Sequence, residues 1–416
     1  MPIPQKDKDI LHQLGEKLAD IAALSIQKEK AEMWTKLNDL KPVKPMIWIN
    51  EIPWHEMDVN DELKTQCEDG FCRSIEGGLR LTLYQWEHMR GDMVIENAIY
   101  SPLSISSTGI GIGEDVDISR TDPRSGIVSR TFHPQIKEEK DIEKIKFPEV
   151  TYNKEATENT YQTMCEIFDG IMPVQKRGIP GTWFAPWDHL IRLWGVQEAM
   201  LDMTLRPELV HKAMDRLISA HLHELDQWEK LNLLARNDNN TRIGSGAYGY
   251  TSELPQKDFN PEKVRAKDIW GCATAQIFSE VSPKMHMEFA LQYEMRWLKR
   301  FGLTYYGCCE PLDIKMSILR EVPNLRKISM SPWINVERAA KEMSNDYVFS
   351  LKPNPEILGR DKWHPDIARQ VLREIMEKLQ GCVVEMIMKD ISTVRYEPQR
   401  LWEWAKIAEE EAEKFA

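Results

Sequence analysis

The chain has 416 residues, of which 54 are basic and 66 are acidic, so its formal net charge is −12. This acidic balance argues against nucleic acid or an anionic membrane as the main partner, because both attract basic surfaces. No apolar run approaches the roughly 20 residues that span a bilayer, and the N-terminus lacks the apolar core of a signal peptide. We therefore expect a cytoplasmic protein that acts on a small molecule, and we expect its seven cysteines to be reduced.

Residues 1–41 predict an N-terminal helical arm, because leucine and isoleucine recur there at three- and four-residue spacing. The residues of this apolar stripe are Leu11, Leu14, Leu18, Ile21 and Leu24. Such an arm would pack on the main domain or on a second subunit of a homodimer. Pro42 and Pro45 interrupt the pattern, and residues 42–416 are expected to form the main domain.

Eight short apolar segments alternate with helical segments in the main domain. They span residues 46–51, 92–98, 181–185, 232–238, 302–307, 326–330, 347–351 and 382–388. Strands that alternate with helices are typical of parallel βαβ units. Eight such units predict the α/β fold class and a closed (β/α)8 TIM barrel with an N-terminal helical extension.

Polar residues that directly follow the strands of such a barrel meet at one mouth, where the chemistry is done. These residues are Glu51, Asp238, Asn239, Cys308, Cys309, Glu310, Ser331, Lys352 and Asp390. Each also has a local interpretation, such as capping a turn, facing solvent or pairing with a neighbouring charge. The stretch Tyr306–Asp313, which reads Tyr-Gly-Cys-Cys-Glu-Pro-Leu-Asp, carries the most reactive groups. Its adjacent thiols could be metal ligands, a nucleophile or small buried side chains.

Several stretches resemble the uroporphyrinogen decarboxylase superfamily. Residues 181–186 and 201–210 resemble the middle of its proteins, where an active-site turn precedes a helix with a "D…PE" pattern. Residues 281–293 resemble the helix before its sixth strand, and residues 45–50 match its first strand in position. The order of these motifs over residues 40–400 is the strongest part of the resemblance. It implies a (β/α)8 barrel.

The resemblance is nearest to the corrinoid-dependent methyltransferase branch of that superfamily. Its decarboxylases carry arginines after the first strand, whereas Glu51–Glu56 of this chain contains none. The methyltransferases of the superfamily bind zinc through a His-x-Cys element and a later cysteine. Here Tyr306-Gly-Cys308-Cys309 keeps thiols in that place but lacks the histidine, and the last strand ends in Lys389-Asp390 without a cysteine. The metal site implied by the resemblance is therefore altered or absent.

If zinc is bound, the resemblance implies Cys308 and Cys309 as ligands, and Glu280 is the first carboxylate to test beside Glu310. His286 and Cys272 are further candidates, although packing is the ordinary interpretation of both. An open coordination position on zinc would bind the heteroatom of a methylated substrate or activate a thiolate. The chain has no Asp-x-His-x-x-Gly motif for a corrinoid, so the cobamide would arrive on a partner corrinoid protein.

The resulting hypothesis is a corrinoid-dependent methyltransferase, specifically the component that demethylates a small methylated substrate. Asp238 or Glu310 would donate a proton to the leaving group. Substrate-binding residues are expected to be Glu51, Trp183, Asn239, Tyr248, Tyr250 and Lys352. Two alternatives are a lyase that acts on a small carboxylated substrate, anchored by Lys352 or Arg242, and a small-molecule binding protein without catalysis.

Overall fold

The computed structural model describes residues 3–120, 123 and 128–415. The chain forms two compact units, each made of more than one stretch of sequence. Unit 1 comprises Met1–Ser104, Asn153–Gly178 and Lys352–Ala416, and unit 2 comprises Ile105–Tyr152 and Ile179–Leu351. No helix in the described part of the chain is both long enough and apolar enough to cross a membrane.

Unit 1 contains two pairs of parallel strands. β1 (Met46–Ile49) pairs with β12 (Val383–Met388), and every residue of both strands is buried. β2 (Ile99–Pro102) pairs with β7 (Val174–Arg177). The helices of this unit are α1 (Gln5–Ala22), α2 (Ser25–Asn38), α3 (Gly70–Met89), α4 (Lys154–Ile167), α12 (Glu356–Gly359), α13 (Pro365–Lys378) and α14 (Gln399–Ala412).

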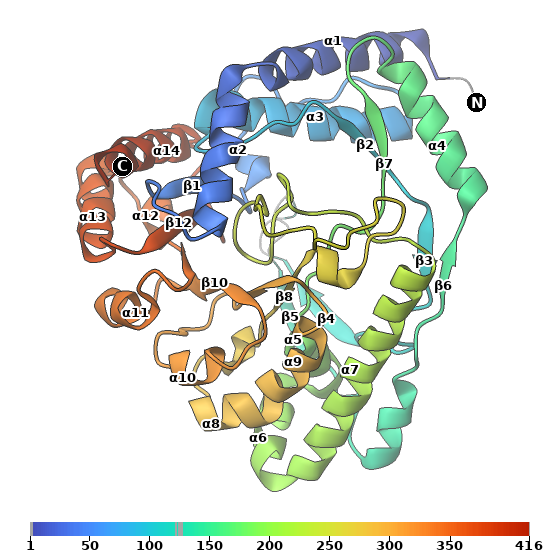
Figure 1. Ribbon diagram of the computed structural model, residues 1–416, viewed down its shortest axis with the longest axis vertical. Coiled ribbons are helices and arrows are strands. Elements are labelled where there is room, and N and C mark those ends of the chain that lie inside the picture. The colour runs from blue at the N-terminus through green and yellow to red at the C-terminus, as the bar shows by residue number, and fades with distance from the viewer. Residues whose placement is uncertain (1–2, 121–122, 124–127, 416) are drawn as a thin grey trace. The chain divides into compact units, whose positions relative to one another are not determined.

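The helical character predicted for residues 1–41 is present as α1 and α2. Leu11, Leu14 and Leu18 form the buried side of α1, as their spacing predicts, and α1 packs against α3 (Figure 1). The predicted boundary at residue 41 between an arm and a main domain stays a prediction.

Unit 2 is built on four parallel strands in the order β8 (Trp270–Ala273), β9 (Leu303–Tyr306), β10 (Leu325–Met330) and β11 (Val348–Leu351). Each residue of β8, β9 and β11 is buried, which is expected where both faces of a parallel sheet are covered. Two antiparallel pairs lie outside this sheet: β3 (Ile105–Ser107) with β6 (Val150–Tyr152), and β4 (Val116–Ser119) with β5 (Ser129–Phe132).

The helices of unit 2 include the long α7 of Figure 1 and a run of short helices between the strands. They are α5 (Pro186–Trp194), α6 (Val196–Leu205), α7 (Pro207–Lys230), α8 (Pro283–His286), α9 (Gln292–Leu298), α10 (Met316–Leu319) and α11 (Val336–Met343). A π-helical turn, Met287–Leu291, joins α8 to α9.

The predicted α/β architecture with parallel strands is confirmed, whereas the strand list needs correction. The segments predicted at 46–51, 302–307, 326–330, 347–351 and 382–388 are strands, but residues 92–98 form none and β2 begins after them. Residues 181–185 and 232–238 contain no regular strand, although Leu234 of the second segment forms an isolated parallel bridge with Ile179, just before the first segment. Pro180 precedes the first segment and lacks a backbone N–H donor, and Pro186 directly after it begins helix α5. β8 was not predicted. It has only four residues and no alternation of apolar and polar side chains, so its sequence does not distinguish a buried strand from another buried segment.

The hydrogen-bonded ladders of the described strands do not close into a ring of eight. The closed TIM barrel therefore stays a prediction.

Candidate functional site

The two adjacent thiols lie just beyond the carboxyl end of β9. Gly307 has a φ of +98°, and a Cβ atom there would lie 2.4 Å from Leu312, so the turn requires glycine. This turn leaves Cys308 buried and Cys309 exposed, with their sulfur atoms 3.3 Å apart. The pair is therefore reachable from solvent through Cys309.

Glu310 is fully buried beside these thiols and is held in one orientation. Its Oε1 accepts a hydrogen bond of 2.9 Å from the Thr274 hydroxyl, just after β8, and its Oε2 accepts one of 2.9 Å from the Cys308 N–H. The Ser329 hydroxyl of β10 donates to the Cys308 carbonyl at 2.6 Å. Three neighbouring strands therefore position this segment, which is the arrangement expected at the carboxyl ends of a parallel sheet.

Cys272 adds a third thiol at the same end of β8. Its Sγ donates to the Thr182 carbonyl at 3.2 Å. Burial raises the pKa of Cys272 to about 11 and nearby Cys308 adds to this, whereas the Arg242 charge and backbone hydrogen bonds oppose it. Cys272 is thus a neutral thiol near pH 7.

A pocket of about 190 Å³ lies where residues 183–185 lead into α5. Its lining residues are Trp183, Phe184, Ala185, Asp188, His189, Arg192 and His221. Trp183 is 49% exposed, so its indole ring is available to a ligand. Phe184 stacks on Trp297, with ring centroids 4.3 Å apart, and forms a fixed apolar wall.

Three titratable groups of this pocket have shifted pKa values. Burial and the Glu310 charge raise the pKa of Asp188 to about 6, against the opposing effects of its hydrogen bond from Gln276 and of Arg192. Burial lowers the pKa of His221 to about 4, and burial with the Arg192 charge lowers that of His189. Both imidazoles are therefore neutral near pH 7, and Asp188 exchanges its proton close to that pH.

The donor atoms do not fit the zinc site implied by the resemblance. No group of three or more His, Cys, Asp or Glu side chains in the described ranges could hold a metal ion. Cys308 and Cys309 lie together, but Glu280 is exposed and its electrostatic effect falls on Lys315. A tetrahedral zinc site needs more ligands than this pair of thiols.

The structure resembles that of a methyltransferase from Methanosarcina mazei. The match has a TM-score of 0.51, covers 93% of this chain and 98% of that chain, and has 12% sequence identity. At this identity the likeness shows the fold alone. No protein-family model and no curated protein matches the chain.

Asp238 and Asn239, predicted near the thiols, have local partners in unit 2. Arg236 donates to Asp238 Oδ1 at 2.9 Å and to its other oxygen. Asn239 Oδ1 accepts from the N–H of Thr241 at 3.0 Å. These contacts build the loop after residue 234.

The predicted tyrosines lie together in unit 2. Tyr248 is buried, its ring lies edge-on to Tyr250 at 6.1 Å, and its carbonyl accepts from Lys327 at 3.0 Å. Their predicted role in substrate binding stays a prediction.

Glu51 and Lys352, also predicted to bind substrate, belong to unit 1. Glu51 has a φ of +51° and lies 3.3 Å from the Lys389 ammonium group. Burial and contact with Glu51 raise the pKa of neighbouring Asp390. Lys352 is buried.

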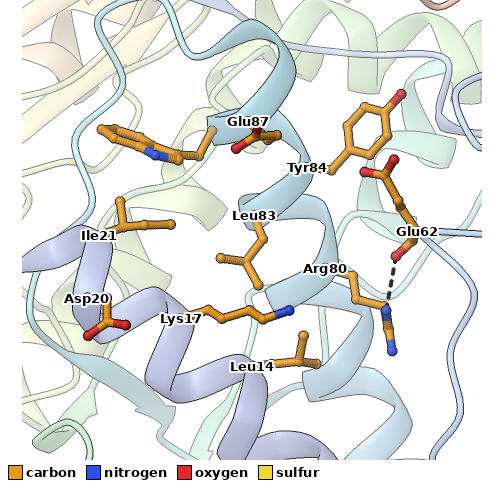
Figure 2. Close-up of a pocket in the computed structure, with 10 residues that line it drawn as sticks. Leu14, Lys17, Asp20, Ile21, Glu62, Arg80, Leu83, Tyr84 and Glu87 are labelled. Atoms are coloured by element: carbon orange, nitrogen blue, oxygen red, sulfur yellow. Dashed lines mark hydrogen bonds between the residues drawn. The ribbon is translucent and has the colours of Figure 1, made fainter. Parts of the chain in front are cut away.

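A larger pocket of about 400 Å³ lies between α1 and α3 of unit 1 (Figure 2). None of the predicted site residues lines it. Arg80 donates to Glu76 at 2.7 Å and to the Glu62 carbonyl at 3.1 Å, and the Glu62 carboxylate lies 2.8 Å from His88. Because Arg80 and Glu62 have these partners within the fold, we assign both a structural role.

Sequence reasoning missed Thr274, Asp188, His189 and His221. Thr274 follows the strand that was not predicted, and His221 lies in the middle of a long helix. For Asp188 and His189 alone, the sequence indicated a functional position. They follow Gly181–Pro186, the segment that resembles an active-site turn, at the start of a helix. A hydrophobic pattern identifies buried positions but does not identify which distant side chains meet there.

Proposed function

We propose that the protein is a methyltransferase that moves a methyl group from a small methylated substrate to a corrinoid carried by a partner protein. The observation that carries the proposal is the buried Glu310 beside the Cys308–Cys309 thiols, because the charge of Glu310 also raises the pKa of Asp188 in the neighbouring pocket. The similarity in fold to a solved methyltransferase supports it.

Removal of the methyl group from a neutral ether, thioether or amine needs a proton donor, because the heteroatom–carbon bond breaks and the heteroatom keeps the electron pair. The methyl group leaves as a cation equivalent to a nucleophilic acceptor, and the heteroatom then takes up one proton. Asp188 is suited to this task, since a pKa of about 6 leaves part of it protonated near neutral pH. Glu310 and Asp238 are the other donors to test, and Asp238 is already paired with Arg236.

The pocket suits a small substrate with an apolar or cationic methylated group. Trp183 offers an exposed aromatic surface, which attracts methyl groups and methylated cations. The neutral imidazoles of His189 and His221 can each donate or accept a hydrogen bond. The thiols of Cys308 and Cys309 would line the path of the methyl group, with no step assigned to zinc.

The direct test is anaerobic incubation of the full chain with reduced cobalamin and a panel of methyl ethers, methyl thioethers and methylamines. We expect one class to give methylated cobalamin and the demethylated product, recorded by absorbance and mass spectrometry. Glu310→Gln and Asp188→Asn should each slow this reaction by roughly 100-fold or more. The matched control is Glu321→Gln, an exposed carboxylate in the turn after α10. Absence of transfer from every class, or unchanged rates in both variants, would overturn the proposal.

A lyase acting on a carboxylated substrate is the second candidate, because the Arg242 charge acts on Cys272 at the same strand ends. A guanidinium group there could bind a substrate carboxylate. This candidate predicts release of carbon dioxide without methyl transfer, and loss of that release in Arg242→Gln. Lys352→Ala tests the other proposed anchor in the same assay.

A further inference from the structure

Four buried polar side chains of unit 2 form a continuous hydrogen-bonded chain beside β9. Lys315 Nζ lies 3.1 Å from His286 Nδ1, and His286 Nε2 lies 2.7 Å from the Tyr306 hydroxyl. That hydroxyl donates to Glu294 Oε2 at 2.6 Å. All four residues have 0% exposure, so water cannot substitute for these contacts.

The π-helical turn between α8 and α9 brings two members of this chain to the same tyrosine. His286 and Glu294 are eight residues apart, whereas two turns of α-helix take about seven. The wider turn at Met287–Leu291 absorbs the additional residue, so both side chains reach Tyr306. π-helical turns of this kind are frequent at functional sites.

Every bond in the chain can be assigned a donor. Burial and the Lys315 charge lower the pKa of His286 to about 3, so the ring is neutral and carries one N–H. With an ammonium group on Lys315, Nδ1 accepts from Lys315, Nε2–H donates to Tyr306, and Tyr306 donates to the Glu294 carboxylate. With a protonated Glu294 and a neutral Lys315 amine, the same bonds run in the opposite direction.

The two ends of the chain bind a proton with similar strength. Burial raises the pKa of Glu294 to about 8, and the charges of Glu310 and Asp188 add to this effect against its hydrogen bond from Tyr306. The second oxygen of Glu294 is buried without a hydrogen-bond partner among the described residues, which also disfavours the carboxylate. Burial lowers the pKa of Lys315 to about 8, against the charges of Glu310 and Glu280.

We propose that Lys315, His286, Tyr306 and Glu294 form a proton relay that stores a proton beside β9 and controls the charge of Lys315 near Glu310. When a proton is transferred along the chain from Lys315 to Glu294, a Lys315 N–H bond first breaks and a His286 Nδ1–H bond forms. The His286 Nε2–H proton then moves to the Tyr306 oxygen, and the Tyr306 proton moves to Glu294. The chain ends as a neutral amine and a carboxylic acid, with all protons and charges conserved.

The role of the relay at the site rests on the proposed function, because removal of a methyl group from a neutral donor consumes one proton in each turnover. Within that reaction the four residues are positioning residues. They act on Glu310 through the charge of Lys315 and have no assigned contact with substrate.

Infrared difference spectra of the full chain, recorded across a pH titration, test the relay without any substrate. We expect a buried protonated carboxyl group that ionises near pH 8 and is absent in Glu294→Gln. Tyr306→Phe removes the middle of the chain and should move this midpoint by about one pH unit or more. The matched control is Tyr305→Phe, because that hydroxyl bonds Ser245 and Ser350 instead. His286→Gln interrupts the same chain and replaces Tyr306→Phe if that variant does not fold.

A carboxyl signal that persists in Glu294→Gln, or an unmoved midpoint in both chain-breaking variants, would overturn the relay. In the methyl-transfer assay, we expect the dependence of the rate on pH to change slope near pH 8. This pH should shift in Tyr306→Phe and stay the same in Tyr305→Phe. If no methyl donor reacts, the proposed function fails while the infrared result still decides the relay.

Discussion

Asp188 is the residue whose protonation should control the reaction near neutral pH. Burial beside Glu310 raises its pKa to about 6, so the acid form needed by a proton donor predominates below that pH and is lost above it. We expect kcat/KM to fall by up to about tenfold per pH unit above pH 6, and Asp188→Asn to remove this limb along with most of the rate. Asp226→Asn, which changes an exposed aspartate paired with Arg300, should leave the profile intact. A limb that survives in Asp188→Asn would assign it to another group.

Cys308 and Cys309 should behave as a dithiol, because their sulfur atoms are 3.3 Å apart and Cys309 is exposed. A trivalent phenylarsenical that binds two thiols should bind with a stoichiometry of one. Either Cys308→Ser or Cys309→Ser should weaken this binding by roughly 100-fold, through loss of the second bond. Cys382→Ser is the control, and equal binding to all three variants would contradict the paired geometry.

Zinc is expected far below one ion per chain after purification without chelator, because no third ligand joins the two thiols in the described residues. Treatment with a chelator should leave the thermal midpoint unchanged. Plasma mass spectrometry checks the metal content, with Cys308→Ser and Cys309→Ser measured in parallel. Stoichiometric zinc that disappears in either variant would restore the metal site that the sequence resemblance implies.

Helix α11 helps to hold the loop that carries the thiols. The Asn335 side chain caps this helix by accepting a 2.9 Å hydrogen bond from the Arg338 N–H, and the Asn335 N–H donates to Asp313 at 3.0 Å. Asn335→Ala should lower the free energy of unfolding by about 1 kcal/mol, measured by urea denaturation, because the helix loses its side-chain cap. Asn345→Ala, in the exposed turn after the same helix, should change it by only a few tenths of a kcal/mol. Equal losses would show that the cap contributes nothing specific.

For the whole molecule, the buried Glu294 predicts a stability that falls as pH rises toward 8. The folded chain keeps this proton up to a pKa of about 8, whereas the unfolded chain releases it near 4.5, so between these values the folded state binds more protons. Lys315 acts in the opposite direction between about 8 and 10.5, where the unfolded chain binds the additional proton. Glu294→Gln should remove the first slope, which is at most about 1.4 kcal/mol per pH unit, so the variant gains stability relative to the parent chain as pH rises toward 8.

Urea denaturation across the pH range checks this prediction. Glu321→Gln serves as the exposed control and should keep the slope of the parent chain. A slope that is the same in Glu294→Gln and the parent chain would show that Glu294 ionises normally in the fold.

The sequence by itself determined the acidic balance, the α/β alternation, five of the parallel strands and the thiol pair, whose closeness follows from adjacency and the Gly307 turn. Only the tertiary structure decided that Thr274 holds Glu310 and that His221 of α7 lines the pocket of α5. It also decided that four distant side chains, Lys315, His286, Tyr306 and Glu294, form a hydrogen-bonded chain. Periodic hydrophobicity reports which positions are buried, because burial depends on local geometry. Hydrogen-bond partners and pKa shifts depend on which groups, distant in sequence, are buried together away from water. Only the packing of the whole chain determines which groups these are.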